Sequence, residues 1–136
     1  MMLTENDIVI NVCSYLTEHG YNIKQALTTT QKGIDIIALK DEKVILIEAK
    51  GETSASEGTK RFGKEFNSNQ AKHHIAMALY AVSCYKTEHP DELHTFGLAF
   101  PKNDNHRKAV NKIMRVIKEL DIKIFWVDDT GTVTMD

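Results

Sequence analysis

Two short apolar runs joined by two acidic residues constrain the fold of this chain more than any other part of its sequence. The runs are IDIIALK, residues 34–40, and KVILIEAK, residues 43–50, and Asp41 and Glu42 stand between them. Apolar runs that flank a two-residue polar turn predict a β-hairpin. Because Ile, Leu, Val and Ala occupy both faces of both strands, we expect the hairpin to be buried inside a sheet.

The turn also predicts which residues face each other across the hairpin. If Lys40 pairs with Lys43, each outward step keeps the sum of the residue numbers constant, and Asp35 falls opposite Glu48. A longer loop centred on the same place gives the same pairing, whereas a bulge would break it. Side chains alternate along a strand, so Lys50 shares the face of Glu48. Three charged groups therefore meet at one end of an otherwise apolar hairpin.

Two acids placed opposite each other need a compensating cation. Opposed residues have β-carbons roughly 4.5–5.5 Å apart, and like charges at that distance repel, more strongly where water is excluded. Lys50 neutralises one carboxylate. Mg²⁺ commonly binds through one or two carboxylates plus water and substrate phosphate, so this pair suits it. The alternative is a salt bridge from Lys50 to Asp35 or Glu48 at a sheet edge. The apolar strands favour the metal site over this alternative.

The remaining segments predict helices that alternate with strands. Three amphipathic helices are expected. The first is capped by Thr4, with Asp7 at the spacing of a capping box, and runs from Glu5 to about Gly20. The second is capped by Ser68 or Asn69 and ends before Pro90, and the third runs from His106 to Leu120. Further strands are expected in YNIKQALTTTQK, LHTFGLAF, IKIFWVD and TVTM. We expect one α/β domain over residues 1–136. Its mixed central sheet combines an antiparallel meander with a parallel, right-handed crossover, and helices flank it.

Charge and cysteine content narrow the class of protein. The formal net charge is -2, so a nucleic acid would have to be attracted by a local basic patch rather than by the whole molecule. The two cysteines lie in helical patterns and are expected to be reduced and buried. The sequence begins without a signal-peptide pattern and has no apolar run long enough to cross a bilayer. We therefore expect a soluble cytoplasmic protein with no membrane partner.

The acidic motif and its position along the chain resemble the PD-(D/E)XK nuclease superfamily, which includes restriction endonucleases and Holliday-junction resolvases. GID at residues 33–35 is followed by EAK at residues 48–50, and Ile34 stands where the family nominally has Pro. The leading helix with an early acid, the hairpin, the helix that follows near a Gln, and the tail from FGLAFP to IKIFWV also match the family's layout. The resemblance implies a restriction endonuclease-like fold.

The resemblance also implies a metal-dependent phosphodiesterase, an endonuclease that acts on DNA, with RNA cleavage permitted by the same chemistry. Asp35 and Glu48 would ligate Mg²⁺, for which Mn²⁺ can substitute, together with the main-chain carbonyl of Ala49. Lys50 would orient or help to deprotonate the attacking water and would offset charge in the transition state. The rival hypothesis is a catalytically silent nucleic-acid or protein-binding module that keeps the fold.

Two further positions match acidic and amide positions of the family. Glu5 would support the metal through water, or would be a helix-start acid favoured by the helix dipole. Gln70 would be a further catalytic residue, or would cap its helix or face solvent. The resemblance also implies a homodimer, because a small nuclease domain commonly needs a second copy to cut both strands.

Basic residues after the hairpin are candidates for nucleic-acid contacts. The candidates for phosphate contacts are Lys60, Arg61, Lys64 and Lys72. Phe62 and Phe66 lie between or beside them and could stack on bases, or could pack back on the domain. The segment from Gly51 to Asn69 is rich in Gly, Ser, Thr and Lys and predicts a long loop.

Overall fold

The computed structural model of this chain describes residues 2–28, 30–52 and 67–136. In chain order its elements are α1 (Glu5–Glu18), β1 (Asn22–Ala26), β2 (Ile36–Lys40), β3 (Lys43–Ala49), α2 (Ser68–Glu88), β4 (His94–Pro101), α3 (Asp104–Asn111), α4 (Met114–Glu119), β5 (Ile122–Val127) and β6 (Val133–Met135).

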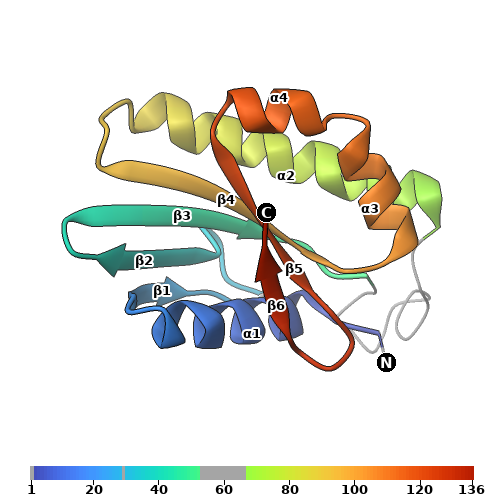
Figure 1. Ribbon diagram of the computed structural model, residues 1–136, viewed down its shortest axis with the longest axis horizontal. Coiled ribbons are helices and arrows are strands. Elements are labelled where there is room, and N and C mark those ends of the chain that lie inside the picture. The colour runs from blue at the N-terminus through green and yellow to red at the C-terminus, as the bar shows by residue number, and fades with distance from the viewer. Residues whose placement is uncertain (1, 29, 53–66) are drawn as a thin grey trace.

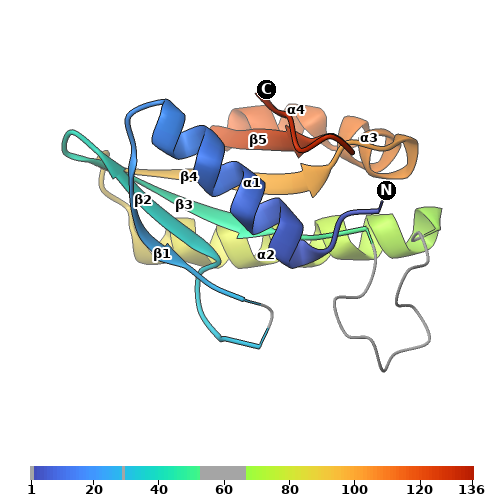
Figure 2. The ribbon, with the colours of Figure 1, turned by 90° about the horizontal axis from the view of Figure 1, so that it is seen from below.

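The strands form a single six-stranded sheet in which they lie side by side in chain order. The pairs β1–β2, β2–β3 and β5–β6 are antiparallel, whereas β3–β4 and β4–β5 are parallel. Helix α1 covers one face of the sheet, and α2, α3 and α4 cover the other (Figures 1 and 2). The predicted mixed α/β fold, with an antiparallel meander, parallel strands and flanking helices, is therefore confirmed.

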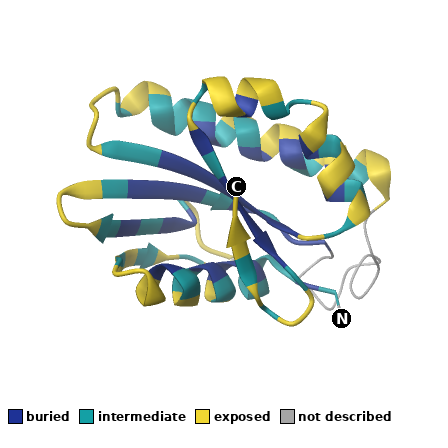
Figure 3. Cartoon of the chain, in the orientation of Figure 1, coloured by how far each residue is buried: buried dark blue, intermediate teal, exposed yellow. Residues whose placement is uncertain are grey.

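Each face of the sheet carries its own apolar core (Figure 3). Helix α1 contributes a stripe of buried residues at helical spacing: Ile8, Val9, Val12 and Leu16. In β3, Ile45, Ile47 and Ala49 belong to the core under α1, whereas Leu46 belongs to the core under α2. Because side chains alternate along a strand, Glu48 and Lys50 face the α2 side.

Both helix starts that matter for the site are held by capping boxes. The hydroxyl of Thr4 accepts a hydrogen bond from the Asp7 amide, and the Asp7 carboxylate accepts one from the Thr4 amide, as predicted. Helix α2 is capped by Asn67 rather than by Ser68 or Asn69, so that prediction was wrong by one or two residues. The spacing of three residues from Asn67 to Gln70 was the sequence signal for the correct cap.

The predicted helix from His106 to Leu120 is two helices in the structure. Helix α3 ends at Asn111, and α4 begins at Met114. Between them the Ile113 amide donates to the carbonyl of Val110, a tighter turn than that of an α-helix. This turn redirects the chain so that Val110 and Ile117 are both buried in the core beneath α2. The sequence has no Gly or Pro there to signal the break.

Glu52 ties three parts of the chain together beside the end of β3. Its carboxylate accepts hydrogen bonds from the Leu3 amide at 2.7 Å and from the side-chain amide of Asn103 at 2.8 Å. The Glu52 amide donates to the Leu3 carbonyl. The side-chain oxygen of Asn103 in turn accepts from the His106 amide and lies 2.9 Å from the His106 ring. The entry to α1, the exit from β3 and the start of α3 are thus joined.

The burial of His106 predicts that the free energy of unfolding decreases in mild acid. Its side chain is fully buried, and burial together with the nearby His74 lowers its pKa to about 4 from an ordinary value of 6.5. Because the unfolded state binds the proton first, the His106 contribution is complete above pH 6.5 and is lost as the pH falls toward 4. The loss amounts to at most about 3 kcal/mol of unfolding free energy.

Urea unfolding between pH 7.5 and 4.5, followed by the fluorescence of the single Trp126, measures this effect. We expect the stability of wild type relative to His106→Gln to decrease as the pH falls, since Gln does not titrate. Subtracting the two curves removes contributions common to both proteins, such as those of His74. Parallel curves would contradict the prediction.

Candidate metal centre

The hairpin register places the two acids as predicted. Lys40 pairs with Lys43, and Ile36, the first residue of β2, pairs with Ile47. Asp35 directly precedes β2, so it is the next residue outward on one strand, as Glu48 is on the other. Both side chains belong to the α2 side of the sheet, since residues alternate between the faces.

The regular backbone hydrogen bonding between β2 and β3 ends at this point, because the side chain of Asp35 takes the place of the next backbone acceptor. Continued pairing would join Ile34 to Ala49. Instead, the Ala49 amide donates to the carboxylate of Asp35 at 2.8 Å, and the Ile34 carbonyl accepts from the side chain of Gln25 at 2.7 Å. In an extended strand the amide and carbonyl of one residue point to the same side. The Ala49 carbonyl therefore points toward Asp35, and it is not engaged in backbone pairing with Ile34.

The two carboxyl groups lie in contact and are mostly buried. Burial, together with the charge of Asp35, raises the pKa of Glu48 to about 7. Burial also raises the pKa of Asp35, although the Ala49 amide and a hydrogen bond with Glu48 oppose that rise. Two acids that resist simultaneous ionisation form a site that is short of positive charge.

Lys50 supplies part of that positive charge. Its ammonium lies 3.7 Å from a Glu48 oxygen, and its backbone amide donates to the Ala99 carbonyl, which extends the parallel pairing of β3 with β4. Burial and the Lys50 charge together lower the pKa of His74 on α2 to about 4. Lys50 therefore lies on the α2 side of the sheet, as the alternation of side chains predicts.

Tyr85 is a site residue that the sequence reasoning missed. Its hydroxyl donates a hydrogen bond of 2.7 Å to the Glu48 carboxylate from helix α2. Burial and this bond raise the pKa of Tyr85, so the hydroxyl remains a donor at neutral pH. A signal was present, because Tyr85 continues the core-facing stripe of Ala78 and Val82 at helical spacing.

Tyr85→Phe is expected to weaken metal binding about tenfold. A partner that hydrogen-bonds to a ligating carboxylate fixes its orientation, and removing it typically reduces metal affinity 10–100-fold. The Tyr85 hydroxyl also lowers the pKa of Glu48, so its loss leaves a proton in competition with the cation. The midpoint of a Mn²⁺ titration, followed by thermal unfolding, measures the change. Tyr80→Phe, at an exposed position of the same helix, is the matched control and should leave the midpoint unchanged.

Glu5 lies near the same site through a close backbone approach. A β-carbon on Gly51 would lie 2.5 Å from the Glu5 amide nitrogen and 2.7 Å from the Thr4 carbonyl carbon. Only glycine therefore lets the residue after Lys50 approach the start of α1 so closely. Burial and the charge of Asp35 raise the pKa of Glu5, while Lys50 lowers it. These interactions place the Glu5 carboxyl beside the cluster.

Of the other candidate residues, the structure describes Gln70 and Lys72, and it does not bring them into the cluster. The side-chain oxygen of Gln70 accepts a hydrogen bond from the Asn67 amide at 2.9 Å, so the structure shows the capping alternative. Lys72 is exposed on α2. The positions outside the described residues are Lys60, Arg61, Phe62, Lys64 and Phe66.

The donors present fit a hard divalent cation. Among residues 2–28, 30–52 and 67–136 there is no group of three or more His, Cys, Asp or Glu side chains arranged to hold a metal ion. Two carboxylates and the Ala49 carbonyl are oxygen donors, and they leave coordination positions for water and a phosphate. Such a set suits Mg²⁺ or Mn²⁺ and not the nitrogen- and sulfur-rich sites of structural zinc.

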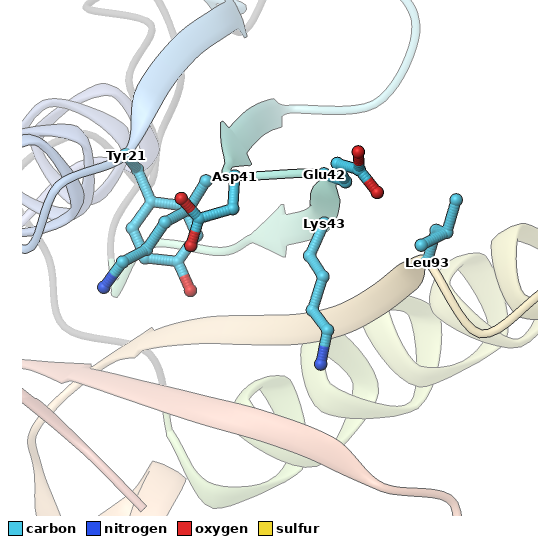
Figure 4. A pocket seen from close by; sticks show the side chains of 6 residues that line it. Tyr21, Asp41, Glu42, Lys43 and Leu93 are labelled. Carbon is cyan, nitrogen blue, oxygen red and sulfur yellow. The ribbon is translucent and has the colours of Figure 1, made fainter.

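A pocket at the other end of the hairpin is separate from this centre (Figure 4). It has a volume of about 500 Å³ and lies around the β2–β3 turn, lined by Tyr21, Lys40, Asp41, Glu42, Lys43 and Leu93. The Lys40 ammonium lies 5.5 Å from the centre of the Tyr21 ring. None of the candidate site residues lines this pocket.

The fold and the site define a mixed α/β domain with paired carboxylates at the end of a buried hairpin. No protein-family model and no curated protein sequence matches the chain. The structure is similar to the crystal structure of a fdxN element excision controlling factor protein from Anabaena variabilis. That similarity has a TM-score of 0.54 and 17% sequence identity, and it covers 95% of this chain and 96% of that chain.

A second, weaker similarity is to SfsA from Pyrococcus furiosus in complex with Ca²⁺, with a TM-score of 0.35 and 17% identity over 93% of this chain and 58% of that chain. The first similarity supports the fold. Across the described part of the chain, no helix combines the length and apolarity needed to cross a membrane.

Proposed function

We propose that this chain is a metal-dependent endonuclease of the PD-(D/E)XK type that hydrolyses phosphodiester bonds in DNA. The observation that carries the proposal is the contact between Asp35 and Glu48. Their carboxyl groups are held together and mostly buried, with raised pKa values, beside a lysine that neutralises only part of their charge. Buried like charges are unfavourable unless a cation joins them, and clusters of this kind are typical of functional sites.

Each residue then has a chemical task. Asp35, Glu48 and the Ala49 carbonyl would hold Mg²⁺, or Mn²⁺ in its place. When bound, the cation supplies a more acidic water and neutralises charge on the phosphate oxygens. Lys50 orients that water and stabilises the negative charge that develops on the phosphate. Glu5 accepts a hydrogen bond from water at the site, and Tyr85 holds the Glu48 carboxylate in position.

A cleavage panel tests the proposal directly. Labelled linear, branched and single-stranded DNA, and matching RNA, are incubated with the protein in Mg²⁺ or Mn²⁺ and in EDTA. We expect metal-dependent cleavage of at least one DNA and its loss in Lys50→Ala. Lys24→Ala, an exposed lysine on β1, is the matched control and should retain activity.

The outcomes separate the proposal from its rival. Cleavage that survives Lys50→Ala would point to a contaminant or to a different active site. Binding of DNA without cleavage, with no thermal stabilisation by Mg²⁺ or Mn²⁺, would favour a catalytically silent binding module. Analytical ultracentrifugation with and without a DNA duplex tests the proposed homodimer, which would place two sites on the two strands.

A further inference from the structure

A groove of about 680 Å³ lies between helices α2 and α3, and none of the carboxylate-site residues lines it. Its apolar lining includes Ile75, Leu79 and Ile113. Three lysines line it as well: Lys72 from α2, Lys108 from α3, and Lys112, the residue that directly follows α3. The Lys112 amide donates to the Lys108 carbonyl, so the helical turn continues through Lys112, and the two lysines, four residues apart, project to the same side.

The charge of this groove is of one sign. No Asp or Glu is among the described residues that line it. All three lysines are exposed, and no salt bridge to any of them occurs within the described residues. A protein with a net charge of -2 thus carries a local concentration of positive charge at this groove.

Helix α2 carries further apolar side chains outside its buried face. Met77 is 51% exposed and Tyr80 is 71% exposed. They are two and five residues after Ile75 on a helix whose buried residues are Ala71, Ile75, Ala78 and Val82. Residues two positions apart on a helix do not face each other, and neither Met77 nor Tyr80 lines the groove. The apolar floor of the groove is therefore formed by Ile75, Leu79 and Ile113 without them.

The residues that line the groove favour one of three candidate occupants over the other two. A nucleic acid is contacted mainly through polar and charged groups, so the apolar floor would remain unused. A second copy of this chain in a two-fold arrangement would place the lysines of one groove against those of the other. A helix with apolar residues on one face and acidic residues beside them satisfies both the floor and the lysines. Charge complementarity therefore selects the third occupant.

We propose that the groove between α2 and α3 is a docking site for an acidic amphipathic helix of a partner protein. Apolar side chains of the partner, spaced by three or four residues, fill the floor formed by Ile75, Leu79 and Ile113. Carboxylates on either side of that stripe pair with Lys72 on one wall and with Lys108 and Lys112 on the other. The proposal does not depend on the nuclease proposal, because no carboxylate-site residue takes part.

The test uses a synthetic fluorescein-labelled peptide of Leu, Ile, Ala and Glu with apolar residues at helical spacing, and a scrambled peptide of the same composition. Binding to the full chain is measured by fluorescence anisotropy. EDTA is present throughout, so that the oligothymidylate used as a control below is not cleaved. We expect saturable binding of the patterned peptide and at least tenfold weaker binding of the scrambled one. The double variant Lys108→Glu/Lys112→Glu should weaken binding of the patterned peptide at least tenfold.

Controls keep the result interpretable. Lys118→Glu changes an exposed lysine of α4 that does not line the groove and should leave peptide binding unchanged. The fluorescence of the buried Trp126 verifies that each variant is folded. Equal binding of the two peptides, or no binding of either, would overturn the proposal. So would a labelled oligothymidylate that binds in place of the peptides and is lost from the double variant, which would make the groove a nucleic-acid site.

Discussion

Replacing Glu48 by Gln is expected to abolish metal-dependent cleavage and, at the same time, to stabilise the metal-free protein above pH 7. The amide cannot ligate a hard cation as a carboxylate does, and the loss of that electrostatic stabilisation corresponds to about 10³-fold in rate, or about 4 kcal/mol. Its oxygen can still accept the hydrogen bond from Tyr85 that the carboxylate receives now.

The gain in stability follows from the raised pKa of Glu48. In the folded protein it is about 7 against an ordinary value of 4.5, mainly because of burial. The folded state binds the proton more tightly than the unfolded state does, so ionisation destabilises the fold as the pH rises from 4.5 through 7. Gln carries no charge at any pH. At pH 8 the variant should therefore be more stable by about 1–3 kcal/mol, and the difference should vanish near pH 4.5.

Urea unfolding in EDTA at pH 8 and pH 4.5 measures this difference, and adding Mn²⁺ should stabilise wild type but not the variant. Glu42→Gln is the matched control, because Glu42 is exposed at the turn of the same hairpin. It should change neither cleavage nor the pH dependence of stability. A Glu48→Gln protein less stable than wild type at pH 8 would show that the folded protein does not raise the pKa of Glu48.

Gly51→Ala is expected to lower the unfolding free energy by about 2–3 kcal/mol. The three atoms nearest to the new β-carbon would be backbone atoms of Leu3, Thr4 and Glu5, all within 3 Å, so a side-chain rotation cannot relieve the clash. The chain must move the start of α1 away from the end of β3. The melting temperature should fall by roughly 10 °C.

The functional effect of Gly51→Ala should exceed the loss of folded protein. Moving the start of α1 withdraws Glu5 from Asp35 and Lys50, so cleavage at 20 °C, where the variant is still folded, should decrease. Circular dichroism measures the folded fraction, and the cleavage rate is normalised to it. Ser14→Ala, on the exposed face of α1, should change neither quantity. Full activity per folded molecule in Gly51→Ala would remove Glu5 from the proposed site.

The acidic pair could be predicted from sequence because a short hairpin obeys a counting rule. Two residues at the turn set the register, and alternation along each strand then placed Asp35, Glu48 and Lys50 together. The capping box of Thr4 and Asp7 is equally local and was predicted for the same reason. Local geometry of this kind does not depend on how distant segments pack.

The partners that come from distant segments were not predictable in the same way. Tyr85 reaches Glu48 only because α2 packs across the sheet at one particular axial position, 37 residues further along the chain. The Ala49 amide donates to the Asp35 carboxylate instead of to the Ile34 carbonyl, and that carbonyl accepts from Gln25 of the neighbouring strand β1. This arrangement depends on how β1 packs beside β2. Tertiary packing also broke the predicted third helix at Ile113, where no residue preference indicates a break.

The hydrogen bonds of Glu52 fix the point at which the chain leaves β3. Its carboxylate holds Leu3 at the entry to α1 and Asn103 directly before α3. Glu5 and Lys50 each lie two residues from one end of the Leu3–Glu52 contact. One carboxylate therefore sets the positions of both the acid on α1 and the lysine after β3, and a change at Glu52 would reach both of them at once.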